Sequence, residues 1–208
     1  MGGYGLGYGR RKKGTRRPHK VFVIVCEGKR TERIYFNNYK KWGCNLKIEM
    51  PYSGDTDPLS LIEFAKKQIS KYELNLKGGD AIWCVFDCNG NNDKIISTAC
   101  KNAGHNVKII LSNPSFELWF LLHFEYYSIK LTNLDLINRL ERYLHNYEKS
   151  KDYYDLLKSK RENAVANAKR LNELHQIKGI NLISVDSNPS TQIFTIVEEI
   201  LKITRYMD

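Results

Sequence analysis

Two continuous runs of apolar residues stand out along the chain, at residues 21–26 and 81–86. They read Val-Phe-Val-Ile-Val-Cys and Ala-Ile-Trp-Cys-Val-Phe, and neither alternates with polar residues. Strands of this kind are buried on both faces, as they are in parallel sheets that carry helices on either side. Residues 46–50 alternate with a period of two, which predicts a strand with one solvated face. Further strands are expected at 106–111 and 180–185.

Helical periodicity fills the intervals between these strands. We expect helices at about 31–41, 58–77 and 93–103, the second beginning at Pro58 with Asp57 as its N-cap. A very apolar helix should begin at Pro114, capped by Asn113, and run to about residue 124. The tetrapeptide Ser-Asn-Pro-Ser occurs at 112–115 and again at 187–190, before a last helix that reaches about residue 206. Both copies are interpreted as helix-starting turns, or alternatively as helix N-termini whose N–H groups face phosphates.

The second half of the chain is mainly helical and amphipathic. Its apolar residues form two stripes at helical spacing. The first consists of Leu131, Leu134, Ile137, Leu140 and Leu144, and the second of Ala164, Ala168, Leu171 and Leu174. The predicted fold class is therefore α/β: a mostly parallel sheet with helices on both faces over residues 19–125. A mainly helical C-terminal extension over 126–208, with one further strand, follows it.

The net charge of +10 is concentrated at the N-terminus. The first 20 residues carry seven Lys and Arg residues and no acid, so the rest of the chain is nearly neutral. Residues 1–18 are also glycine-rich, and we expect them to be disordered when free because they cannot bury enough apolar surface. Tyrosines interleaved with cations suit contact with nucleic acid, and a solubilising tail is the alternative. The candidate nucleic-acid-binding residues of this leader are Arg10, Arg11, Lys12, Lys13, Arg16 and Arg17.

The sequence argues against a membrane or secreted protein. No apolar run approaches the roughly 20 residues that cross a bilayer, and the basic N-terminus is followed by a strand-length segment without a signal cleavage site. The five cysteines are an odd number scattered through predicted elements, so we expect reduced thiols and no structural zinc site. These features favour a cytoplasmic protein with no membrane partner.

Each of the two apolar runs ends in a carboxylate, Glu27 after the first and Asp87 after the second. The carboxyl ends of parallel strands meet at one edge of a sheet, where open α/β sheets bind ligands. Two carboxylates placed there can hold a hard divalent cation and leave its other positions to water and phosphate. Asn89 and Asp93 in the following loop add further oxygen ligands. For Glu27, a solvated residue at the start of a loop is the alternative.

The apolar helix after Pro114 contains two ionisable residues, Glu117 and His123. Buried ionisable groups need partners. Glu117 lies in the first turn, where the helix dipole favours a negative charge, and it can point toward the same sheet edge. A purely structural role is the alternative for Glu117. His123 is expected to be a hydrogen-bonded core histidine.

Several short motifs follow one another in order between about residues 21 and 195. They are Cys26-Glu27-Gly28 with Thr31-Glu32, Val85-Phe86-Asp87, the segment from Ser112 to Trp119 with His123-Phe124, and the segment from Asn188 to Thr191. In these motifs and in its basic leader the sequence resembles the RloB family and, through it, the Toprim-type domains of metal-dependent nucleases and phosphotransfer enzymes. The resemblance implies a Toprim-like sheet whose acidic residues bind Mg²⁺. It also implies a role in antiviral defence by abortive infection, beside an ATPase partner of the AAA or ABC type or a restriction system.

The resemblance assigns roles to individual residues. Glu27 would ligate the metal or move a proton, and Asp87 would be a direct ligand. One departure is Asn89, which stands where the Toprim pattern has a second aspartate and supplies only a neutral oxygen. Metal affinity should therefore fall unless Asp93 or Glu117 compensates.

The leading hypothesis is a Mg²⁺-dependent nuclease, with Mn²⁺ as a substitute, that cuts RNA (tRNA included) or DNA. The alternative is a catalytically weak or inactive Toprim-like sensor of nucleic acid or nucleotide that signals to a partner ATPase; a structural scaffold is a third reading. The chain has no Walker A loop, so ATP hydrolysis would belong to the partner. The expected catalytic residues are Glu27, Asp87, Lys29 and Glu117; the expected metal ligands are Glu27, Asp87, Asn89 and Asp93; Lys29 and Arg30 would contact phosphate, together with the leader.

Overall fold

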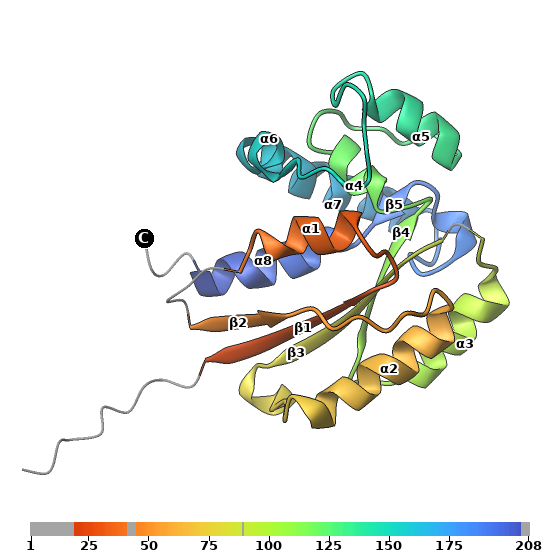
Figure 1. Cartoon of the computed structure of the whole chain (residues 1–208). Helices are drawn as coiled ribbons and strands as arrows, with labels where there is room; N and C mark the ends of the chain where they lie inside the picture. The colour runs from red at the N-terminus through yellow and green to blue at the C-terminus, as the bar shows by residue number, and fades with distance from the viewer. Residues whose placement is uncertain (1–18, 41–44, 89, 205–208) are drawn as a thin grey trace, which may run out of the picture.

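The computed structural model describes residues 19–40, 45–88 and 90–204 of the 208-residue chain. Its centre is a five-stranded sheet in the order β2-β1-β3-β4-β5 (Figure 1). Strands β1 to β4 are parallel, and β5 runs antiparallel beside β4. The strands are β1 (Lys20–Cys26), β2 (Leu46–Glu49), β3 (Ala81–Asp87), β4 (Lys108–Asn113) and β5 (Ser190–Thr191). The predicted α/β class with a mostly parallel sheet is confirmed.

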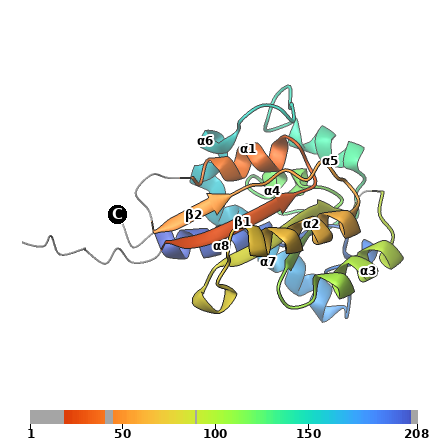
Figure 2. The same ribbon diagram turned by 60° about the horizontal axis from the view of Figure 1, so that its bottom comes forward.

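Helices cover both faces of the sheet, and Figure 2 brings the face with α2 and α3 forward. The helices of that face are α2 (Pro58–Lys71) and α3 (Asp93–Ala103). Four helices pack on the opposite face: α1 (Thr31–Asn37), α4 (Glu117–Leu121), α7 (Arg161–Ile177) and α8 (Ile193–Thr204). Two more, α5 (Asn133–Leu140) and α6 (Tyr154–Leu157), lie farther from the sheet on the same side (Figure 1). The sheet is therefore buried between two helical layers.

The apolar runs of β1 and β3 are continuous because both of their faces are buried. Phe22 and Ile24 pack in the layer of α1, whereas Val23 and Val25 pack in the layer of α2. Successive side chains of a strand point to opposite faces, so a strand covered on both sides has no position that favours a polar residue. The continuous apolar pattern of β1 and β3 therefore follows from the helices that cover both faces of the sheet.

Helix α2 begins as predicted and ends early. Asp57 Oδ2 accepts a hydrogen bond from Ser60 N (2.9 Å), and Pro58 lies in the first turn. The helix ends at Lys71 and not near residue 77, because Glu73 adopts a left-handed conformation with φ of 51°. A short 3₁₀ turn at Leu76–Gly78 leads into β3.

The first predicted apolar stripe is confirmed except at Leu134: Leu131, Leu140 and Leu144 are buried, and Ile137 is partly buried. Leu134 is 69% exposed, whereas Leu136 and Leu140 are fully buried. The reason is the capping box: Thr132 Oγ1 accepts from Asp135 N (3.2 Å), which starts α5 at Asn133 and turns Leu134 toward solvent. The second stripe is correct, since Ala164, Ala168 and Leu171 of α7 are buried.

The strand predicted at 180–185 is not formed. The chain turns there, a 3₁₀ helix covers Val185–Ser187, and the last strand is the two-residue β5. The physical reason is that Asn113 Nδ2 donates to the carbonyls of Ser184 (3.2 Å) and Val185 (3.0 Å), which therefore bind a side chain and not a neighbouring strand. Asn113 also does not cap a helix, because it ends β4 and α4 begins only at Glu117.

The two Ser-Asn-Pro-Ser segments lie side by side. Ser112 pairs with Thr191 and Asn113 with Ser190 in the antiparallel ladder, and each Asn-Pro peptide bond is cis. Ser112 Oγ and Thr191 Oγ1 are 2.8 Å apart. The two segments are therefore not simple helix-starting turns, as predicted, but pair with each other at the β5 edge of the sheet.

The helices after residue 125 share a core with the sheet. Leu171 of α7 and Ile196 of α8 belong to the same apolar cluster as Ile24 of β1. The predicted division of the chain at residue 125 remains a prediction. Within the described ranges, no helix is long and apolar enough to span a bilayer.

Candidate functional site

A pocket of about 420 Å³ lies at the carboxyl edge of the sheet, where β1 and β3 end. Five segments distant in sequence contribute to it: the turn from β1 into α1, the loop between β2 and α2, the end of β3, the start of α4, and the loop after α5. The lining residues are Glu27, Gly28, Lys29, Arg30, Thr31, Glu32, Thr56, Asp87, Phe116, Glu117 and Lys149. The structure therefore brings together five of the predicted site residues: Glu27, Lys29, Arg30, Asp87 and Glu117.

Glu27 and Asp87 lie next to one another at the ends of the paired strands β1 and β3. Glu27 Oε2 accepts a hydrogen bond from Asp87 N (3.0 Å). Asp87 Oδ1 in turn accepts from Phe116 N (2.9 Å) at the start of α4. These bonds fix the orientation of both side chains and use one oxygen of each. Among the residues that the structure describes, none donates a hydrogen bond to the second oxygen of either carboxylate.

Glu32 is a third carboxylate of the pocket, and sequence reasoning did not assign it to the site. It lies in the first turn of α1, is only 5% exposed, and accepts a hydrogen bond from Gly28 N at Oε1 (3.2 Å). Its carboxylate occupies the place that a Cβ atom on residue 28 would take, which explains the glycine after Glu27. Burial raises the pKa of Glu32 to about 7, and the charges of Glu117 and Glu27 contribute to the increase.

Glu117 is the most enclosed carboxylate, with 2% exposure, and it is held by three donors. Ser115 Oγ donates to Oε2 (2.8 Å), and Tyr147 OH donates to Oε1 (3.0 Å). Lys149 Nζ lies 3.4 Å from Oε1. Glu117 therefore ties the loop that follows α5 to the pocket, and it is the carboxylate with the fewest contacts left to offer a ligand.

Four carboxylates, those of Glu27, Glu32, Asp87 and Glu117, form what we call the acidic floor of the pocket. Their negative charges repel one another. Burial raises the pKa of the Asp87 carboxyl well above its ordinary range, and three neighbouring carboxylates, those of Glu32, Glu117 and Glu27, raise it further. Burial also raises the pKa of Glu27, although the hydrogen bond from the Asp87 backbone opposes this. A bound cation would relieve the mutual repulsion that these shifts report.

Lys149 supplies a positive charge at the edge of the acidic floor. Partial burial alone would lower its pKa, but the charge of Glu117 and those of other nearby carboxylates outweigh this effect and raise it. The side chain is 66% exposed, so its ammonium group also faces the solvent at the pocket mouth. Lys29 and Arg30, both exposed, extend this basic rim.

The donor set of the pocket fits a hard cation only in part. Over the residues that the structure describes, no three His, Cys, Asp or Glu side chains are grouped as a ready metal site. Glu27 and Asp87 nevertheless each keep one oxygen. Mg²⁺ is commonly held by one or two carboxylates, with water and substrate phosphate as its other ligands. This chemistry fits Glu27 and Asp87 as a pair.

The other predicted ligands are placed elsewhere or not described. Asp93 begins α3, is exposed, and accepts a hydrogen bond from Val185 N (2.9 Å), so it is not among the residues lining the pocket. Asn89 lies outside the described residues, as do the leader cations Arg10, Arg11, Lys12, Lys13, Arg16 and Arg17. Their predicted roles remain predictions.

His123 lies in the core and not in the pocket. It is fully buried, its Nδ1 is 2.8 Å from Trp119 O, and its ring packs edge-on against Trp119 at 4.9 Å between centroids. Burial lowers the pKa of His123 to about 4, so the ring is neutral. The cysteines within the described residues, Cys26, Cys84, Cys88 and Cys100, are free, as expected; Cys44 lies outside them.

Sequence patterns could have identified some of the site residues that were not predicted, but not others. Glu32 follows Gly28 by four residues in the first helical turn, a spacing that puts an acid beside the strand end and was available as a signal. No comparable signal in the sequence points to Lys149 or Tyr147. They reach the pocket because the loop after α5 folds back, where Thr31 Oγ1 donates to Lys149 O (3.3 Å) over a separation of 118 residues.

Comparison with known proteins gives one match. A family model described as "RloB-like protein" matches residues 22–200. No curated protein and no solved structure matches the chain. The matched range includes every residue that lines the pocket.

Proposed function

Because this chain belongs to the RloB-like family, we propose that it is a Mg²⁺-dependent nuclease whose active site is the pocket at the ends of β1 and β3. The observation that supports this proposal most is the layout of charge in the pocket. Carboxylates form its floor, and Lys29, Arg30 and Lys149 stand at its rim. The acidic floor alone would repel a phosphodiester. A metal ion bound to the floor, together with the basic side chains at the rim, would attract it.

Glu27 and Asp87 would hold the cation through the oxygens that their backbone hydrogen bonds leave free. When bound, Mg²⁺ supplies positive charge to the phosphodiester and a template for the attacking water. Mn²⁺ has similar ligand preferences and should substitute. Asn89 remains a proposed additional oxygen ligand, and its neutral amide implies a weak site. Asp93 is left out of the proposed ligand set, because its Oδ1 accepts from Val185 N and it does not line the pocket.

The chain's own residues would act on the substrate in three ways. Lys29, Arg30 and Lys149 would contact phosphate oxygens and stabilise the charge that develops in the transition state. Glu32, whose pKa lies at about 7, is suited to accept a proton at its carboxylate near neutral pH. Glu117 would position Lys149 through the contact of 3.4 Å, and is a positioning residue in this scheme.

A second candidate function is supported by the absence of a ready three-ligand metal group within the described part of the chain. In this alternative the pocket senses nucleic acid or a nucleotide without cutting it, and a partner ATPase receives the signal. A role in antiviral defence beside such an ATPase, which the family resemblance implies, is part of the proposal under either function.

The test is cleavage of labelled tRNA, single-stranded RNA and duplex DNA by the purified protein, with Mg²⁺, Mn²⁺ or EDTA. Asp87→Asn keeps an acceptor for Phe116 N, so the fold should survive while cleavage falls at least about 100-fold. Asp155→Asn, an exposed acid on α6 with 87% side-chain exposure, is the matched control and should cut like the wild type.

Metal-dependent cleavage that Asp87→Asn removes would support the nuclease. Binding without cleavage of any substrate in Mn²⁺ would favour the sensor, and cleavage that appears only when the partner ATPase is added would assign the activity to the complex.

A further inference from the structure

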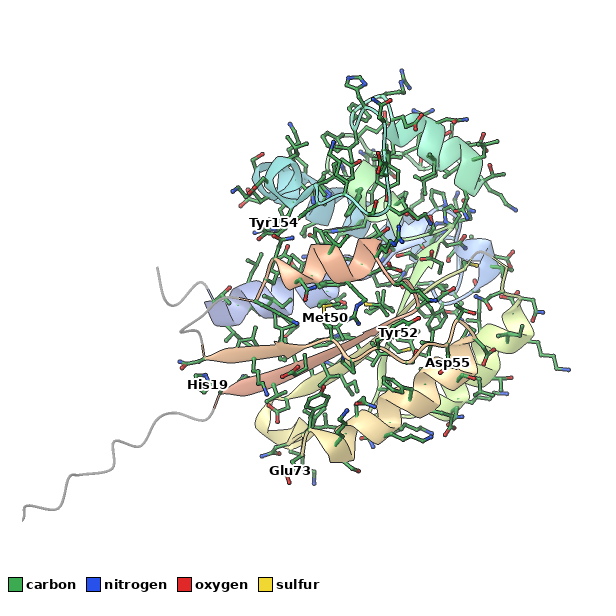
Figure 3. The ribbon with its side chains drawn as sticks, viewed as in Figure 1. His19, Met50, Tyr52, Asp55, Glu73 and Tyr154 are labelled. Atoms are coloured by element: carbon green, nitrogen blue, oxygen red, sulfur yellow. The ribbon has the colours of Figure 1, made fainter. Side chains whose placement is uncertain are left out.

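Tyr52 is an exposed aromatic residue close to the pocket. It lies in the loop between β2 and α2 and is 46% exposed. In Figure 3 the labelled residues Met50, Tyr52 and Asp55 follow one another along this loop, on the side of the molecule where β1 ends. Thr56 of the same loop lines the pocket. The ring of Tyr52 is therefore exposed to solvent near the pocket.

Two cations lie over the Tyr52 ring near the outer limit of a cation–π contact, so a base that stacks on a covered face must displace them toward its phosphates. Lys29 Nζ and Arg33 Cζ each lie 5.8 Å from its centroid. Lys29 also lines the pocket, so it connects the aromatic ring to the site. Arg33 Nη1 donates to Met50 O (2.8 Å), which fixes the start of the loop against α1. The ring is thus positioned by contacts within the protein before any ligand arrives.

Many proteins bind single-stranded nucleic acid through exposed aromatic rings that have cations beside them. The ring stacks on a base, and the cations follow the phosphate backbone. Every base offers a π-face, so such a contact tolerates many sequences. In a duplex the faces of the bases are already covered by stacking, and a base must leave the stack before it can meet a side chain.

We propose that Tyr52 stacks on an unpaired base next to the phosphate bound in the pocket, so that the protein selects single-stranded polynucleotides or unpaired loops over duplexes. The position of the bound phosphate rests on the proposed function, whereas the stacking contact itself needs no cleavage. Lys29 and Arg33 contact the phosphates on either side of that base, and the phosphate at Lys29 is the one that enters the pocket.

The experiment measures binding in EDTA, where no metal-dependent cleavage occurs, and again in Ca²⁺, which also binds carboxylate oxygens and offsets the charge of the floor. The probes are single-stranded RNA and DNA oligonucleotides that contain 2-aminopurine, and duplexes made from the same strands. The variants are Tyr52→Leu, which removes the ring, and Tyr52→Phe, which keeps it. Tyr143→Leu is the matched control, because Tyr143 is a 38% exposed tyrosine that is stacked on Phe124 and does not line the pocket.

We expect Tyr52→Leu to weaken binding of the single strand about tenfold and to abolish the quenching of 2-aminopurine fluorescence. Tyr52→Phe should bind within about twofold of the wild type, as should Tyr143→Leu. Duplex binding should be weaker and should not change with Tyr52→Leu. Equal results with RNA and DNA would mean that the base face alone is read, and a preference for RNA would add a contact to the 2′-hydroxyl.

Three results would overturn the inference: unchanged single-strand binding by Tyr52→Leu, an equal loss for duplex and single strand, or a loss in Tyr52→Phe as large as in Tyr52→Leu. Failure of the proposed function is a separate outcome. Ring-dependent binding without any metal-dependent cleavage would leave the stacking role standing and remove the nuclease, whereas cleavage that is independent of residue 52 would do the reverse.

Discussion

The carboxylates at the ends of β1 and β3 differ from the carboxylate on α4, although all three line one pocket. Glu27 and Asp87 each receive one backbone hydrogen bond and are partly exposed. Glu117 is almost fully buried and has three partners, from Ser115, Tyr147 and Lys149. The strand ends therefore offer oxygens to a ligand, while Glu117 uses its oxygens within the protein. An acidic residue in a pocket is thus a ligand or a structural anchor according to how many donors it already has.

The largest effect that we expect from this difference between Glu117 and the strand-end carboxylates is on the stability of the protein. Glu117→Ala removes the acceptor of Ser115, Tyr147 and Lys149 and should lower the free energy of unfolding by about 3 kcal/mol, since breaking a buried pair leaves its partners unsatisfied. Denaturant unfolding measures the change. Glu27→Ala is the comparison and should cost less, about 1 kcal/mol, because it removes one acceptor, that of Asp87 N. A Glu117→Ala protein as stable as the wild type would remove the anchoring role.

The next effect concerns pH. The pKa of Glu32 is about 7 in the folded protein against an ordinary value of 4.5, so the folded state holds this proton more tightly than the unfolded chain. Its contribution to stability is present below pH 4.5 and is lost as the pH rises through about 7. The loss amounts to at most about 3 kcal/mol in metal-free buffer.

Glu32→Gln cannot lose a proton and keeps an acceptor for Gly28 N. Relative to the wild type it should therefore gain stability between about pH 5 and about pH 8, as measured by denaturant unfolding at both values. Identical pH dependence of the two proteins would show that Glu32 is not held in its protonated form.

A smaller effect is expected from Gly28→Ala. The new methyl group would meet the Glu32 carboxylate, which is buried and cannot turn away freely. We expect a loss of about 1–2 kcal/mol in stability. The double variant Gly28→Ala with Glu32→Ala should recover part of this loss, and a loss that persists in full would place the cause elsewhere in the turn.

The smallest effect is expected from Asp93→Asn. The amide oxygen of the new side chain would still accept from Val185 N, and the position is exposed and away from the pocket. Stability should change by less than about 0.5 kcal/mol, and metal affinity should not change if Glu27 and Asp87 are the ligands. A clear loss of metal affinity would restore Asp93 to the ligand set that the sequence suggested.

Local patterns were sufficient to predict the parallel part of the sheet and about half of the site. The continuous apolar runs of β1 and β3 identify parallel strands buried on both faces, and parallel strand ends must meet, which places Glu27 beside Asp87. The carboxylate that follows each run needed no knowledge of the rest of the chain.

The remaining features depend on contacts that no local pattern encodes. Lys149 reaches the pocket only through the return of a loop that lies 118 residues after Thr31. The two-residue β5 is too short to carry a period, and the side chain of Asn113 binds the carbonyls that residues 184 and 185 would have used in a strand. Leu134 and Leu136 were equally apolar, and the capping box at Thr132 decides between them.

The measurement that tests the central claim most directly is calorimetric titration of the metal-free protein with Mn²⁺ and Mg²⁺. It should be made on the wild type, Asp87→Asn and the control Asp155→Asn. The account predicts a single site per chain in the wild type and the control, and a loss of at least about tenfold in affinity in Asp87→Asn. No binding by the wild type, or equal affinity in Asp87→Asn, would contradict the assignment of Glu27 and Asp87 as the cation site.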